Sequence, residues 1–137
     1  MNEYDFNKIA VGMSEEFVTT VTDEMMELFL RLSGDVNPLH VDADYARLKG
    51  FPNRVVYGML SSSLYSTLVG VYLPGKYCLL QGVEITFHHP VYVGDVLTVR
   101  GEISYINEAY RMVEVKSYIK NQDNKKISKA KIKAGFL

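Results

Sequence analysis

The chain has 137 residues, of which 47% are hydrophobic and 23% charged, and its formal net charge is −1. This size and composition predict a single globular domain over residues 1–137 and differ from those of disordered chains. The lack of net positive charge argues against nucleic acid or an anionic membrane as a partner. A lone cysteine, Cys78, excludes an internal disulfide and a cysteine-rich zinc site, and we expect neither a metal nor a cofactor.

No apolar run is long enough to span a bilayer, and the first residues do not resemble a signal peptide, so we expect a cytoplasmic protein. The β-branched residues within 17–21 predict a strand. A helix is predicted between Thr22, a typical N-cap, and Gly34, a typical terminator. Its expected buried face follows the helical repeat: Met25, Leu28, Phe29 and Leu32.

The stretch Ser33–His40 combines an acid, an amide and an imidazole within a few positions. Gly34 and the pair Asn37-Pro38 predict a bent loop rather than regular secondary structure. On such a loop Asp35 and His40 can converge, and a carboxylate beside an imidazole can move a proton. Judged from these residues alone, Asp35 could instead cap a turn while His40 only packs.

Residues 43–48 predict a short helix, and Asp42 before it is better explained as its cap than as a third catalytic acid. The segment 58–73 is apolar or small nearly all round, which predicts a buried helix. Gly58 opens this helix without a Cβ that would block a ligand from the first free amides. Those amides could stabilise negative charge on a carbonyl oxygen, although glycine before a helix is common without such a role.

Residues 78–136 alternate apolar and polar side chains in four segments, 78–89, 96–106, 111–120 and 126–136. This period of two predicts an antiparallel meander with one covered and one wet face. The positions expected on the covered face are Leu79, Val83, Ile85 and Phe87; Leu97, Val99, Ile103 and Tyr105; Val113, Val115 and Ile119; and Ala130, Ile132, Ala134 and Phe136. Only the helix at 58–73 is apolar enough to cover them. The predicted fold is therefore α+β, a hot-dog fold in which a curved antiparallel sheet wraps one long helix.

The polar face of the predicted sheet carries many lysines, at positions 116, 120, 125, 126, 129, 131 and 133. Their spacing follows the pleat and favours a solvated face, but contacts with the phosphates of a substrate remain open. His88 and His89 are expected on opposite faces, which makes them a poor metal pair and favours structural or rim positions.

Four motifs resemble the MaoC-like (R)-specific enoyl-CoA hydratases in order and spacing. The most specific runs from Phe29 through Leu32-Ser33-Gly34-Asp35-x-Asn37-Pro38-Leu39-His40 to Ala46. The others are Tyr57-Gly58-Met59-Leu60-x-x-Ser63-Leu64, Leu73-Pro74-Gly75 and Pro90-Val91-Tyr92-Val93-Gly94-Asp95. Many relatives carry His where this chain has Tyr57.

The resemblance implies that Asp35 and His40 form a catalytic dyad that holds one water. That water adds to a trans-2-enoyl-CoA thioester and gives the (R)-3-hydroxyacyl-CoA. Asn37 is expected to fix the loop, and the Gly58 amide to bind the thioester carbonyl. Tyr57 and Ser63 of the second motif are expected beside the substrate. A homodimer is also implied.

The sequence also allows two other functions. A 3-hydroxyacyl-ACP dehydratase would use the same chemistry on a carrier protein, which the lysines could suit. A hot-dog protein that only binds or hydrolyses acyl thioesters would change the class, but such thioesterases generally lack the Asp-x-Asn-Pro-x-His loop.

Overall fold

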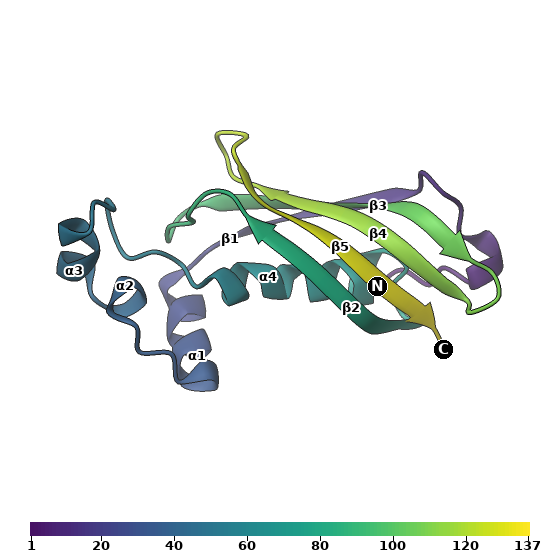
Figure 1. Ribbon diagram of the computed structural model, residues 1–137, viewed down its shortest axis with the longest axis horizontal. Helices are drawn as coiled ribbons and strands as arrows, with labels where there is room; N and C mark the ends of the chain where they lie inside the picture. Colours follow the sequence, from purple (N-terminus) through teal and green to yellow (C-terminus); the bar gives the residue numbers. More distant parts are fainter.

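The computed structural model describes residues 1–137, and one curved sheet partly encloses one helix (Figure 1). The helices are α1 (Asp23–Ser33), α2 (Pro38–Val41), α3 (Ala43–Leu48) and α4 (Gly58–Thr67). Two shorter helical segments are η1 (Phe6–Lys8) and the π-helical η2 (Leu68–Tyr72). The strands are β1 (Ser14–Thr20), β2 (Cys78–Phe87), β3 (Val96–Asn107), β4 (Met112–Lys120) and β5 (Lys126–Phe136). None of the helices combines the length and apolar character that a membrane crossing requires.

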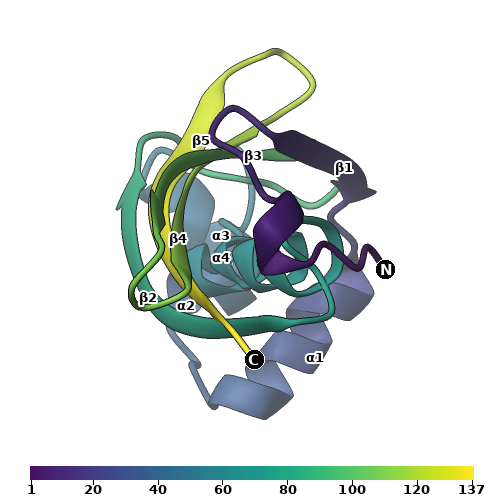
Figure 2. The ribbon, with the colours of Figure 1, turned by 90° about the vertical axis from the view of Figure 1, so that its right-hand side faces the viewer.

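The five strands form a sheet in the order β1-β3-β4-β5-β2, and all neighbours are antiparallel. Viewed from the end, the sheet curls around α4 (Figure 2). The predicted meander holds for β3, β4 and β5, whereas β2 pairs with β5 and not with β3. The connection 88–95 therefore carries the chain from one edge region of the sheet to the other. This leaves β1 and β2 as the two edge strands.

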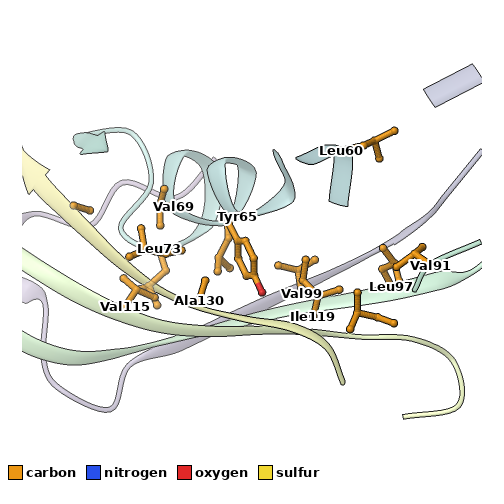
Figure 3. Close-up of a cluster of buried hydrophobic side chains, with 14 of the residues drawn as sticks. Leu60, Tyr65, Val69, Leu73, Val91, Leu97, Val99, Val115, Ile119 and Ala130 are labelled. Atoms are coloured by element: carbon orange, nitrogen blue, oxygen red, sulfur yellow. The ribbon is translucent and has the colours of Figure 1, made fainter. Parts of the chain in front are cut away.

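The core lies between α4 with η2 and the concave face of the sheet, as the alternation predicts. Tyr65, Val69 and Leu73 point toward the strands, where they meet buried side chains of β3, β4 and β5 (Figure 3). The Tyr65 hydroxyl lies 2.8 Å from the Ser128 hydroxyl, which satisfies both polar groups inside the core. Burial raises the pKa of Tyr65 to about 12, so its phenol stays neutral. The predicted helix at 58–73 is confirmed as α4 followed by one π-helical turn. Its predicted burial on nearly all sides is wrong for one face, where Met59, Ser63 and Ser66 are exposed because the sheet covers the opposite side only.

The predicted buried face of α1 is only partly right. Thr22 caps the helix by accepting a hydrogen bond from the Met25 amide, as expected. However, the deeply buried residue is Met26, while Leu28 is exposed and Leu32 is 83% exposed. The helix lies beyond the end of the sheet (Figure 1), and only the side that carries Met26 and the partly buried Met25 and Phe29 is covered.

The predicted covered face of β3 changes at a β-bulge. Ile103 pairs with Val115, but Tyr105 pairs with Glu114, so one residue of β3 has no counterpart at Ser104. The extra residue turns Tyr105 outward, where it is exposed, contrary to the prediction. Because the alternation shifts by one position, Ile106 packs against the core instead.

The predicted covered face of β2 is also largely wrong. Ile85 packs against the core, but Leu79, Val83 and Phe87 are exposed. An edge strand has a neighbour on one side only, and β2 also carries a register shift between Leu80 and Gly82. The structure thus leaves an apolar strand with an unpaired edge, which isolated sheets normally avoid.

Candidate active site

The segment Ser33–His40 runs from the last residue of α1 into α2, at the end of the sheet where α4 begins (Figure 1). Gly34 ends α1 with a φ of +70°, a conformation that glycine adopts without strain. The Ser33 hydroxyl donates to the Phe29 carbonyl and accepts from the Asp35 amide, at 2.7 and 3.2 Å. These bonds turn the chain sharply after α1 and set the direction in which Asp35 leaves it.

His40 lies in a short helical turn, which corrects the expectation of a loop without regular structure. The Asn37 side chain caps α2 by accepting from the Leu39 amide at 3.0 Å, and Pro38 occupies the first helical position. Proline is well suited there because its missing N–H has no helical partner in any case. The Asn37 amide also donates to Asp35 Oδ1 at 3.0 Å, so Asn37 orients the carboxylate through its backbone.

Asp35 and His40 converge, as the loop geometry predicts. His40 Nε2 lies 4.0 Å from Asp35 Oδ2, and the two side chains are 15% and 47% exposed. This separation is too long for a direct hydrogen bond, so both atoms remain available to a third group between them. Nδ1 of His40 lies 2.7 Å from the Val55 carbonyl and must donate to it, which makes Nε2 the acceptor in a neutral ring.

The start of α4 lies beside Asp35 and His40. Gly58 and Met59 line the same hollow of about 250 Å³ as Asp35, His40 and Tyr57. The first amides of α4 have no partner within the helix and carry the positive end of its dipole. A Cβ added to Gly58 would lie 3.2 Å from the Phe87 ring, so Phe87 packs directly on the opening turn of the helix. The arrangement can both move a proton and stabilise negative charge.

A second hollow of about 300 Å³ adjoins the first. His40, Gly58 and Phe87 border both hollows. Val91 and Ile127 contribute apolar side chains to the second hollow. The place of Phe87 at the site could have been suspected from sequence, since it is the last apolar residue of its strand, but its close contact with Gly58 could not.

The structure does not bring Ser63 to either hollow. Ser63 is exposed, and its hydroxyl donates to the Leu60 carbonyl at 2.6 Å. Ser61, two residues earlier and therefore on the opposite, buried side of the helix, lines the second hollow instead. A substrate contact by Ser63 therefore stays a prediction.

Asp42 takes the place that the sequence indicates, whereas His88 and His89 lie after the end of β2 at the rim of one hollow and not on opposite faces of a strand. His88 and His89 border the second hollow, and His89 Nδ1 lies 2.8 Å from the Lys126 carbonyl. The Asp42 carboxylate caps α3 by accepting from the amides of Asp44 and Tyr45, so the predicted cap is confirmed. None of the three stands between the dyad and α4.

The model of the MaoC-like domain matches residues 7–125 of the chain. The chain belongs to the MaoC-like domain family. An (R)-specific enoyl-CoA hydratase from Aeromonas caviae is 42% identical over 80 residues, which cover 58% of this chain and 60% of that protein. Another from Rhodospirillum rubrum is 37% identical over 93 residues, covering 68% and 65%. The chain thus aligns with somewhat less than two thirds of these relatives.

The structural comparison extends over nearly the whole chain. The R-hydratase PhaJ1 from Pseudomonas aeruginosa, in its unliganded form, superposes with a TM-score of 0.89 and 30% identity. The match covers 96% of this MaoC-like chain and 84% of that one. It confirms the predicted hot-dog fold and the MaoC-like resemblance.

Proposed function

We propose that this MaoC-like protein is an (R)-specific enoyl-CoA hydratase, a hydro-lyase that acts reversibly on trans-2-enoyl-CoA. The observation that carries the proposal is the gap of 4.0 Å between His40 Nε2 and Asp35 Oδ2, which opens to the same hollow as the first turn of α4. The hydratase names and folds of the similar proteins support the same reaction.

One water can occupy the gap between the two acceptors. It donates one hydrogen bond to each, which points an oxygen lone pair away from the dyad and toward the substrate. The oxygen forms a bond to Cβ as one water proton passes to the dyad, and the thioester becomes enolate-like. The first amides of α4 stabilise the charge on the thioester oxygen. A proton from the dyad then returns to Cα on the same face, which gives syn addition.

The reverse reaction tests the stereochemistry. We expect the protein to dehydrate the (R) enantiomer in a racemic 3-hydroxybutyryl-CoA mixture and to leave the (S) enantiomer unchanged, because the dyad approaches the substrate from one side only. Chiral analysis of the remaining hydroxyacyl thioester gives the result. Equal consumption of both enantiomers would contradict the proposed geometry.

A second question is whether the acyl thioester is carried by CoA or by an acidic carrier protein. The basic outer face of the sheet bears on this choice. Lys116, Lys126 and Lys129 are exposed and have no carboxylate within 4.0 Å, whereas Lys131 pairs with Glu114. These free cations favour a 3-hydroxyacyl-ACP dehydratase as the second candidate, with an acidic carrier protein as the substrate carrier. Turnover of matched CoA and carrier-protein substrates separates the two, and thiol release without hydration would instead indicate a thioesterase.

The proposal includes a homodimer. Strand β2 offers an unpaired edge and exposed apolar side chains, among them Leu79, Leu80 and Phe87. Pairing of this edge with the same strand of a second copy would satisfy its backbone and cover the apolar surface. We take residues 1–137 as one MaoC-like unit located in the cytoplasm.

The solution mass tests the dimer. We expect light scattering at micromolar concentration to give twice the chain mass of 15.5 kDa. Replacing Leu80 by Lys places charge on the proposed interface and should shift the species toward monomer. A monomeric mass for the wild-type chain would remove this part of the proposal.

A further inference from the structure

Few contacts attach the dyad loop to the body of the protein. Residues 34–38 are all exposed, and the segment before α4 supplies the tertiary hydrogen bonds that the loop makes. Two come from Val55, whose amide donates to the Leu39 carbonyl at 3.1 Å and whose carbonyl accepts from His40 Nδ1. The third comes from Tyr57, whose hydroxyl donates to the Asp35 carbonyl at 3.0 Å. Asp35 itself is therefore tied to the body of the protein through Tyr57.

The Tyr57 side chain also fixes the second member of the pair. Its ring centroid lies 4.2 Å from that of His40, at an interplanar angle of 32°, and 4.9 Å from that of Phe29 in α1. Tyr57 is only 2% exposed, so the ring has little freedom to move. One side chain thus touches the backbone of Asp35, the ring of His40 and the helix that precedes the loop.

Tyr57 also belongs to the segment that opens α4. Tyr57 is the N-cap residue of α4 and directly precedes Gly58, whose amide is the proposed carbonyl donor. The two halves of the site, proton transfer and charge stabilisation, come from segments about twenty residues apart in sequence. Tyr57 connects them, because its side chain contacts Asp35 and His40 while its backbone is bonded to Gly58.

We propose that Tyr57 is a positioning residue, which holds the Asp35–His40 pair at its working distance from the start of α4 through its hydroxyl and ring. The inference rests on the proposed hydratase function and assigns the Tyr57 hydroxyl to Asp35 rather than to the substrate. Burial, and then the charge of Asp35, raise the pKa of Tyr57, while Arg54 opposes the shift. The phenol consequently keeps its proton and remains a donor at physiological pH.

A double-mutant cycle tests the connection to Asp35. We expect Tyr57→Phe to lower kcat for enoyl-CoA hydration about 10-fold, with KM changed less than about 3-fold, because a displaced dyad slows the chemical step. In an Asp35→Asn background the same change should cost less than about 2-fold, since the group that it positions is already disabled. Tyr110→Phe, at an exposed tyrosine, is the matched control and should match wild type.

Three outcomes would overturn the assignment. Tyr57→Phe could keep the wild-type kcat, it could raise KM alone, or it could cost the same factor with and without the Asp35 carboxylate. Tyr57→His restores a ring donor at this position and should recover part of the lost kcat, whereas Tyr57→Leu should not.

Amide hydrogen exchange gives a readout that does not depend on turnover. We expect Tyr57→Phe to speed exchange of the amides of Asn37, Leu39 and His40, which bond within the loop, by about 10-fold, while the β3–β4–β5 amides keep their protection. Unchanged loop exchange would overturn the positioning role. If the wild-type protein failed to hydrate any enoyl thioester, the hydratase proposal would fall, and this exchange experiment would decide the role of Tyr57 by itself.

Discussion

Asp35→Asn and His40→Ala are each expected to slow hydration of crotonyl-CoA by about 100-fold or more, the usual scale for loss of a general acid–base group. His40→Ala removes one of the two acceptors of the water, and Asp35→Asn replaces the carboxylate by an amide that cannot take up a proton, so either change interrupts the proton transfer to Cα. The initial rate of loss of the enoyl absorbance at saturating substrate measures the effect. The double variant should be little slower than either single one, because the two residues act as a unit.

Asp44→Asn is the matched control for the dyad, since Asp44 is a nearby carboxylate whose side chain is 95% exposed. It should retain the wild-type rate. Circular dichroism should show the same fold in all variants, because Asp35 and His40 lie outside the core. Folded variants with wild-type turnover would exclude these residues as the dyad.

Gly58→Ala is expected to lower kcat/KM about 10-fold or more. The new Cβ would lie 3.2 and 3.3 Å from two atoms of the Phe87 ring, which borders both hollows, so Cβ and ring crowd the opening of the helix. The substrate carbonyl then cannot approach the first amides of α4 as closely, and these donors stabilise the charged intermediate. Stability should change by less than about 1 kcal/mol, because alanine is favoured over glycine in a helix by at most about that amount, and the half-exposed Phe87 ring can shift slightly to relieve the crowding.

Gly70→Ala provides the control for this prediction. Gly70 lies in η2, the continuation of α4, and a Cβ there would meet no atom within 4 Å. It should leave kcat/KM unchanged. An equal loss in both variants would point to the helix as a whole, and wild-type activity of Gly58→Ala would place the carbonyl donor elsewhere.

The strands and the central helix were predictable because their patterns are long and regular. Residues 58–73 are apolar or small on nearly all sides, and Val113, Val115 and Ile119 alternate as a covered strand must. The exceptions have local causes that a regular repeat does not contain. The bulge at Ser104 reverses the face of Tyr105, and the edge position of β2 exposes Leu79 although its side chain fits the alternation.

The candidate site was predictable in its components but not in its geometry. The Asp-x-Asn-Pro-x-His spacing indicates a loop that brings Asp35 and His40 together, which the structure shows. The tautomer of His40 depends on the Val55 carbonyl, fifteen residues away, and no local pattern marks that contact. The same holds for Phe87, which reaches Gly58 only because β2 lies at the edge of the sheet beside the start of α4.

The most direct test of the central claim is the hydration of a trans-2-enoyl-CoA series of increasing chain length, followed by the ultraviolet absorbance of the conjugated thioester. The purified wild-type protein is predicted to remove this absorbance for at least one chain length, to release no free thiol, and to yield the (R)-3-hydroxyacyl-CoA. Unchanged absorbance across the whole series, with the protein folded, would contradict the assignment of Asp35, His40 and the start of α4 as a hydratase site.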